Sequence, residues 1–276
     1  MQAWITLLTQ PDYLLGVRTL WRSLQQNGSR YPLVVMVTEA IPETTRRLLI
    51  NEGCRVREVP ALRPRPGIRA HYARAQFSEV WTKLCAWAQD DFSRLVFLDA
   101  DMLVVKNMDS LFTQPLPTGW IAACHACRCN PLRIDRYPAD WVPENCFYSH
   151  YQPGQPMPRD GSAGYFNSGF MMLTPDKTTY AALQRALDAI DDLTRYPFPE
   201  QDLLNAFFDR RWRQLPYGYN ALKTLIYQHP PLWDDATVHA IHFILQKPWQ
   251  TEARSNDADA ALLERWRRTA EGLPDA

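Results

Sequence analysis

Two aspartates lie one residue apart in an otherwise apolar run, LVFLDADMLVV, at residues 95–105. Asp99 and Asp101 follow strand-forming residues, so we expect them where a buried strand gives way to a loop. Burying one unpaired carboxylate costs on the order of several kcal/mol, and two close together also repel each other. Carboxylates at positions i and i+2 can point the same way and share a divalent cation, with oxygen ligands favouring magnesium or manganese. The alternative is a turn with two solvated aspartates, and the apolar flanks argue for the metal.

A second motif, HFILQKPW from residue 242, could complete such a site. His242 is expected at a strand end, and imidazole suits manganese better than magnesium. Lys247 offers an ammonium group, which is a point charge suited to phosphate. A single histidine is more commonly structural, so the interest of His242 depends on the two aspartates.

Two polar motifs follow further along the chain, FNSGF from residue 166 and PEQDLLN from residue 199. Asn167 and Ser168 can offer hydrogen bonds within an apolar strand, and Gly169 permits a close approach of a ligand. The alternative is a simple β-bulge. Glu200 and Gln201 fall in the first turn of an expected helix, where a carboxylate also complements the helix dipole.

Four cysteines, Cys124, Cys127, Cys129 and Cys146, are the remaining candidates for chemistry. Thiolates close in sequence can share a tetrahedral zinc ion. Cysteine is also a small buried hydrophobe, and the irregular spacing weakens the zinc interpretation. The sequence leaves both interpretations open.

The elements that must position these residues alternate between strand and helix. The first hundred residues read as β-α-β-α-β, followed by a helix and the strand that carries the aspartates. This order predicts an α/β fold, a Rossmann-like mixed, mostly parallel sheet flanked by helices, with ligands beyond the carboxyl ends of the strands. The expected strands are 3–9, 31–38, 54–59, 95–98, 164–173 and 237–244, and the expected helices are 13–28, 42–53, 78–92, 175–193, 200–212 and 256–272.

Composition limits the classes of protein that fit. With 276 residues, 46% of them hydrophobic, we expect one domain over 1–276, in which 126–163 is a loop-rich insertion and 256–272 a C-terminal helix. Thirty basic residues balance thirty acidic ones, so nothing favours nucleic acid or an anionic membrane as a partner. The apolar runs are shorter than the ~20 residues of a membrane span. The N-terminus lacks the pattern of a signal peptide and cysteines are sparse, so we expect a cytoplasmic location.

In their order, these motifs resemble glycosyltransferase family 8, the group that includes glycogenin, lipopolysaccharide galactosyltransferases and galactinol synthases. The resemblance runs from AWITLLTQPDYLLG through WTKLCAW, LVFLDAD, YFNSGFMML, PEQDLLN and GYN to HFILQKPW, about residues 3–250. It implies a GT-A fold and retaining transfer of a hexose from a nucleotide-sugar donor, usually a UDP-sugar. Manganese, or else magnesium, would bridge the diphosphate. The acceptor, whether a saccharide, a polyol or a glycoconjugate, is not implied.

The resemblance also implies roles for individual residues. Asp99, Asp101 and His242 would be the metal ligands, and Lys247 would contact the diphosphate. The catalytic candidates are Glu200, Gln201 and Lys247. The residues implied to bind the donor are Leu7, Leu8, Gln10, Tyr13, Arg74, Lys83, Asp99, Ala100, Asp101, Asn167, Ser168, Gly169 and Lys247.

Departures from the family pattern shape the expected chemistry. Glu200 replaces an aspartate frequent in the family, and Gln201 is a poor nucleophile, so we expect no covalent intermediate. Tyr227 lies at a spacing similar to that of the self-glucosylated tyrosine of glycogenin, but the following QHPPLW favours an external acceptor.

Two other functions, and the presence of a lid over the donor, stay open. A binding module with this fold could have lost turnover, and a haloacid-dehalogenase-type phosphatase also places Asp-x-Asp after an apolar strand. That phosphatase motif is disfavoured because Leu103 replaces its threonine or valine and because a β-α-β-α-β unit precedes the motif. We also expect 126–163 and Arg63–Arg74 to form the acceptor side and a lid, the alternative being a rigid flap.

Overall fold

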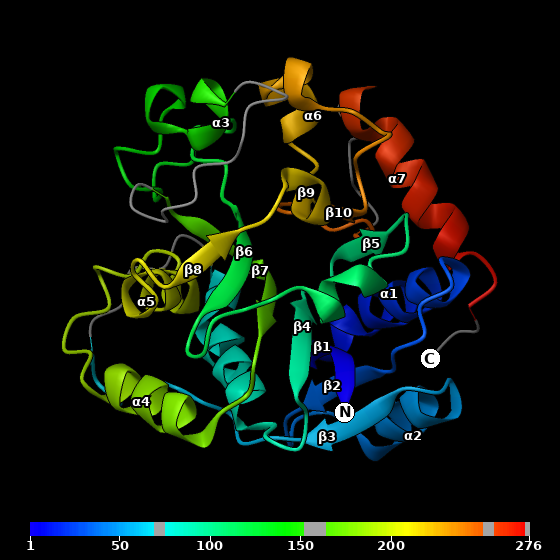
Figure 1. Ribbon diagram of the computed structural model, residues 1–276, viewed down its shortest axis with the longest axis vertical. Coiled ribbons are helices and arrows are strands. Elements are labelled where there is room, and N and C mark those ends of the chain that lie inside the picture. Colours follow the sequence, from blue (N-terminus) through cyan, green and yellow to red (C-terminus); the bar gives the residue numbers. More distant parts are fainter. Residues whose placement is uncertain (69–74, 152–163, 251–256, 274–276) are drawn as a thin grey trace.

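The computed structural model describes residues 1–68, 75–151, 164–250 and 257–273. Its centre is a seven-stranded sheet of order β3-β2-β1-β4-β7-β6-β8 (Figure 1). Neighbouring strands run parallel, except that β7 is antiparallel to both β4 and β6. The predicted mixed, mostly parallel sheet is therefore confirmed. Its strands are β1 (Gln2–Leu8), β2 (Leu33–Val37), β3 (Arg55–Glu58), β4 (Arg94–Leu98), β6 (Ile121–His125), β7 (Phe166–Leu173) and β8 (Trp212–Gln214).

Helices cover both faces of this sheet. Successive side chains of a strand point to opposite faces, so Ile5 of β1 joins the core that contains Trp81, while Trp4 joins the core that contains Val17. Strands buried on both faces read as continuous apolar runs, as LVVMV of β2 does. One face is covered by α1 (Leu14–Gln26) and α2 (Glu43–Asn51), and the other by η2 (Ala75–Ala88), α4 (Lys177–Asp188) and α5 (Pro199–Phe207).

A second, three-stranded sheet stands beside the first. Its order is β5-β10-β9, with β5 (Met102–Val104) antiparallel and β9 (Ala221–Leu222) parallel to β10 (Ala240–His242). A third core joins it to α6 (Leu225–Gln228) and α7 (Asp257–Ala270), and α7 lies against α1 (Figure 1). The remaining elements are α3 (Phe147–His150) and the 3₁₀ turns η1 (Pro11–Tyr13), η3 (Asp109–Thr113), η4 (Pro143–Asn145), η5 (Tyr217–Asn220) and η6 (Pro230–Leu232).

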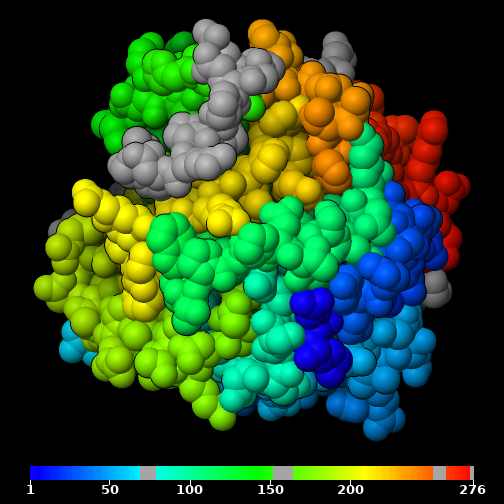
Figure 2. Space-filling view, viewed as in Figure 1, coloured from blue at the N-terminus to red at the C-terminus, as the bar shows by residue number. Residues whose placement is uncertain are grey.

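Two of the expected helices differ in the structure, and a short strand follows the two aspartates. The strand expected at 95–98 is β4 of the large sheet, and the residues after Asp101 form β5 of the small sheet, so the two aspartates lie at the junction of the sheets. The segment between β5 and β6 crosses the face of the molecule seen in Figure 2, where it is the blue-green band across the middle. The helix expected at 200–212 ends at Phe207, and β8 follows it.

The helix expected at 78–92 is a 3₁₀ helix, η2. A 3₁₀ helix has three residues per turn, so side chains spaced by three lie along one line. Trp81, Leu84 and Trp87 have this spacing and are almost completely buried. The repeat of its largest apolar side chains therefore fits the tighter winding.

No helix among the described residues is both long enough and apolar enough to span a membrane. The cytoplasmic location stays a prediction.

One buried histidine at the end of β6 makes stability depend on pH. His125 stacks on Phe147 with ring centroids 3.6 Å apart, and burial lowers the pKa of His125 to about 4. The unfolded chain, with a histidine pKa of about 6.5, binds this proton first as the pH falls. We therefore expect the contribution of His125 to the free energy of unfolding to fall by about 2 kcal/mol between pH 7 and pH 5.

Denaturant unfolding at the two pH values measures this loss. His125→Gln should remove that part of the pH dependence, whereas His150→Gln, at an exposed position, should keep it. The same pH dependence in wild type and His125→Gln would contradict the prediction.

Candidate active site

The two aspartates are fixed by backbone hydrogen bonds from both sheets. Asp99 follows β4, and its N–H donates to the carbonyl of Gly169 in β7 at 2.8 Å. The carbonyl of Asp101 accepts from the N–H of Phe243, just after β10, at 2.9 Å. Because β7 is reversed, its polar beginning lies at the edge where β4 ends. The chain thus brings residues from distant segments to one place.

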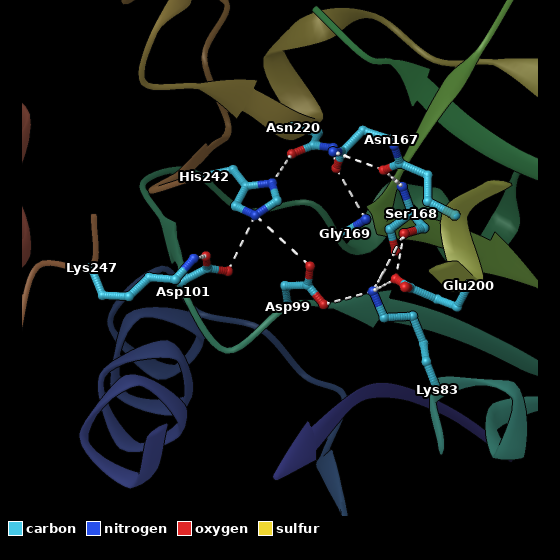
Figure 3. A network of polar contacts seen from close by, with 11 residues as sticks. Lys83, Asp99, Asp101, Asn167, Ser168, Gly169, Glu200, Asn220, His242 and Lys247 are labelled. Carbon is cyan, nitrogen blue, oxygen red and sulfur yellow. Dashed lines mark hydrogen bonds and ion pairs between the residues drawn. The ribbon is translucent and has the colours of Figure 1, made fainter. Parts of the chain in front are cut away.

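His242 faces both carboxylates (Figure 3). Its Nε2 lies 3.2 Å from Asp101 Oδ1 and 3.8 Å from Asp99 Oδ2, and the three potential ligand atoms lie within 4.8 Å of one another. Adjacent ligands of an ion with metal–ligand distances near 2.1 Å are separated by about 3 Å. Two carboxylates and an imidazole are therefore close enough together to share one divalent cation, with mixed oxygen and nitrogen ligands.

A chain of hydrogen bonds sets the tautomer of His242 (Figure 3). The backbone N–H of Gly169 donates to Asn167 Oδ1 at 3.0 Å, so that atom is an acceptor. Asn220 Nδ2 donates to the same oxygen at 2.9 Å, which leaves Asn220 Oδ1 to accept from His242 Nδ1 at 2.8 Å. In a neutral imidazole the proton is then on Nδ1, and the lone pair of Nε2 points toward the two aspartates.

Asn220→Ala should weaken manganese binding by about 10- to 100-fold, because it removes the group that orients a metal-ligating histidine. Isothermal titration calorimetry of the metal-free protein with manganese measures the affinity. Asn27→Ala is a matched control, since Asn27 donates its amide to the carbonyls of Ser23 and Val104, away from the site. Equal affinities in the Asn220 variant and wild type would show that the tautomer is set in another way.

Gly169 leaves room for the side chains of His242 and Asp99. A Cβ atom at this position would collide with the ring of His242 and lie 2.8 Å from Asp99 Oδ2. The glycine in FNSGF is therefore required by the neighbouring side chains of the site. The close approach of a ligand to Gly169 stays a prediction.

Buried charges form one network across the site. Asp101 is paired with the ammonium group of Lys247. Burial opposes ionisation of Asp101, but the nearby Lys247 and His242 more than offset it and hold the pKa of this carboxyl below its ordinary value. Lys83 Nζ lies 3.0 Å from Asp99 Oδ1 and 2.8 Å from Glu200 Oε1. Burial opposes its charge too, yet the two carboxylates raise the pKa of Lys83.

The charges of this network do not balance. Three carboxylates, Asp99, Asp101 and Glu200, face two ammonium groups, Lys83 and Lys247, so a neutral His242, the form that can ligate a metal, would leave one negative charge in excess. A divalent cation would reverse the sign of this excess and make the site attractive to an anion.

The two candidate catalytic side chains of α5 are held by hydrogen bonds. Glu200 Oε1 accepts from the Ser168 hydroxyl at 2.9 Å in addition to its pair with Lys83. Gln201 Oε1 accepts from the Ser168 N–H at 3.0 Å and from Asn167 Nδ2 at 3.2 Å. Gln201 Nε2 donates to the Tyr165 hydroxyl at 3.0 Å. Both side chains are thus oriented at the wall of the cavity.

One cavity brings together most of the residues implied by the resemblance. It is lined by Leu7, Gln10, Tyr13, Lys83, Asp99, Ala100, Asp101, Asn167, Ser168, Gly169, Glu200, Gln201, His242 and Lys247. Leu8 is not among the lining residues, since strand side chains alternate and its side chain lies in the core on the other face of the sheet. Its role in binding the donor stays a prediction. Arg74 lies outside the described residues. Tyr227 is not among the lining residues, and burial raises the pKa of its hydroxyl to about 12.

The described part of the expected insertion, 126–151, forms another wall of this cavity. This part of the chain contributes polar and aromatic side chains to the wall, from Asn130, Tyr137 and Trp141. The ring of Phe198 stacks on that of Trp141, with the ring centroids 4.3 Å apart. The other part of the expected lid, Arg63–Arg74, is described only to residue 68, and it is not among the lining residues there.

Sequence reasoning did not assign Asn220 or Tyr165. Both act through other side chains, so no motif of their own identifies them. Asn220 lies in GYN, which contributed to the resemblance, and that position was the available signal.

Comparison with known proteins adds independent findings. The chain matches the model of glycosyl transferase family 8 over residues 4–253. It is 31% identical to galactinol synthase 1 of Arabidopsis thaliana over 278 residues, which cover 96% of this chain and 77% of that protein. It is also 31% identical to galactinol synthase 1 of Solanum lycopersicum over 271 residues, covering 96% and 80%. Among solved structures, the galactosyltransferase LgtC with donor and acceptor sugar analogues matches with a TM-score of 0.62 at 18% identity, covering 100% of this chain and 97% of that chain. The fold is thus the GT-A fold that the resemblance implied.

Proposed function

Since the chain belongs to glycosyl transferase family 8, we propose that it moves a hexose from a UDP-sugar to an external acceptor with retention of configuration. The observation that carries the proposal is the convergence of Asp99, Asp101 and His242 beside Lys247 in one cavity. Proteins named galactinol synthase and galactosyltransferase are similar to this chain, so galactose is the first donor sugar to test.

Asp99, Asp101 and His242 are the residues that would hold the cation. A bound manganese ion, or magnesium in its place, would supply positive charge to the diphosphate oxygens of the donor. Lys247 lies on the Asp101 side of this site. Its ammonium group can stabilise the charge that develops on the departing diphosphate.

The surroundings of Glu200 and Gln201 argue against a covalent intermediate. The Glu200 carboxylate is buried and shared between Lys83 and Ser168, which weakens it as a nucleophile. The Gln201 oxygen accepts two hydrogen bonds already. We propose that both side chains orient the sugar and that retention does not pass through an enzyme-bound glycosyl ester.

The acceptor is proposed to bind against the wall made by 126–151. Tyr137, Trp141 and Phe198 are large, partly apolar groups at the cavity. Such groups exclude water, and exclusion matters because water is the competing acceptor of the sugar. Whether this wall also moves as a lid stays a prediction.

A donor screen tests the proposed function. UDP-galactose, UDP-glucose and UDP-N-acetylglucosamine are each incubated with the protein and manganese, and released UDP is measured with and without a set of polyols and saccharides. We expect manganese-dependent UDP release from one donor, increased by an acceptor. Binding of UDP with no release from any donor would support an inactive module, and release of inorganic phosphate from sugar phosphates would support the phosphatase alternative.

A further inference from the structure

A second group of potential metal ligands lies apart from the aspartates. Cys127 and Cys129 lie in the loop after β6, Cys146 lies between η4 and α3, and His229 follows α6. All four residues are buried. Their neighbouring elements, α3 and α6, lie at the same end of the molecule (Figure 1). Three separate segments therefore bring three thiols and one imidazole to one place.

The distances within this group have the dimensions of a tetrahedral site. His229 Nε2 lies 3.7, 3.2 and 3.6 Å from the Sγ atoms of Cys127, Cys129 and Cys146. The Sγ atoms of Cys127 and Cys146 are 3.9 Å apart, and all four ligand atoms lie within 4.8 Å of one another. Tetrahedral zinc with Zn–S near 2.3 Å and Zn–N near 2.0 Å requires sulfur–sulfur distances of about 3.8 Å and sulfur–nitrogen distances of about 3.6 Å. We propose that Cys127, Cys129, Cys146 and His229 bind a structural zinc ion.

A disulfide and a purely apolar role both fit the cluster less well than zinc does. A disulfide needs its sulfurs about 2.05 Å apart, and all six cysteines of the chain are free. A purely apolar role for the cysteines does not account for an imidazole nitrogen that faces all three sulfurs.

The chemistry of the cluster separates it from the aspartate site. Three thiolates and an imidazole favour zinc over manganese, whereas two carboxylates and an imidazole accept the harder ion. Four protein ligands also fill the coordination sphere, which is typical of structural zinc and leaves no position for a substrate. This inference therefore does not depend on the proposed transferase activity.

The zinc ion would connect the cavity wall made by 126–151 to the C-terminal part of the chain. Cys127 lines the cavity, and the loop that holds Cys127 and Cys129 continues into the wall containing Tyr137 and Trp141. His229 follows α6, and Leu225 of α6 lies in the same core as α7. Bonds through one ion would hold these segments at fixed separation, which hydrogen bonds between thiols do only weakly.

Metal analysis of the whole chain tests the site. After dialysis against EDTA, which strips weakly held manganese, wild type should retain about one zinc ion per chain and release it on mercurial modification of its thiols. Cys129→Ser should lose the zinc. Cys124→Ser is the matched control, because Cys124 is a buried cysteine near the same strand end whose thiol donates to the Pro216 carbonyl at 3.2 Å. Asp101→Asn should also retain the zinc, which separates the two sites.

Two further measurements test the zinc site even if Cys129→Ser does not fold. Cobalt added to metal-free wild type should give the intense visible bands of tetrahedral cobalt bound to thiolates, and His229→Cys should keep both zinc and thermal stability. Zinc-grown wild type with no retained metal, an intact mass showing a disulfide, or zinc lost from Asp101→Asn but kept in Cys129→Ser would each overturn the proposal.

Discussion

Asp101→Asn should reduce manganese-dependent UDP release by at least about 10³-fold. The amide is a weak ligand, and the change also removes the negative charge that pairs with Lys247 and faces His242. Steady-state UDP release over a manganese titration measures the loss, with the melting temperature recorded to exclude unfolding.

Asp109→Asn provides the control for removing a buried aspartate. Asp109 accepts from the Ser29 hydroxyl at 2.7 Å and lies outside the residues that line the cavity. This variant should keep manganese-dependent release. Full activity of Asp101→Asn or Asp101→Ala with the metal chelated would sink the assignment of the site.

Lys247→Met should lower kcat by about 10²- to 10³-fold, the usual cost of removing one group that stabilises charge in the transition state. The side chain is buried and paired with Asp101, so the variant also leaves that carboxylate with His242 as its remaining partner. An uncompensated buried charge destabilises a protein. We therefore expect a lower melting temperature without manganese and partial recovery with it, because the cation replaces the missing charge.

A second buried lysine supplies the comparison. Lys223 pairs with Asp259 at 3.5 Å and is not among the residues lining the cavity. Lys223→Met should lower the melting temperature with or without manganese and leave kcat within a few-fold of wild type. If Lys247→Met loses stability in the same way, and its folded fraction turns over normally, then Lys247 has only a structural role.

The sheet could be predicted because its signals are local. Apolar runs such as LVVMV and the helical spacing after Tyr13 each fit within one element, and strand–helix alternation then limits the topology. The short strand β5 was not predicted in this way, because it pairs with β10, which lies more than 130 residues further along the chain by its residue numbers. The 3₁₀ form of η2 also depends on packing against the sheet.

The site was predictable in two steps. The spacing of Asp99 and Asp101 indicated a cation site by itself, the order of the motifs then supported His242 as a third member, and the structure supplies the distances between them. Asn220 was missed because it acts through a hydrogen bond to His242. His229 was missed because it lies 83 residues from Cys146, and spacing between cysteines contains no information about a distant histidine.

The pairing of β5 with β10 has a consequence for biosynthesis. Asp101 and Lys247 are 146 residues apart, and the last strand of the large sheet, β8, ends at Gln214. A ribosome can therefore release every strand of the large sheet before the histidine and lysine of the site emerge. Contacts of such long sequence separation form late in folding. A nascent chain thus has its large sheet before His242 and Lys247 reach the candidate site, and truncation after β8 would leave a protein in which Asp99 and Asp101 have neither partner.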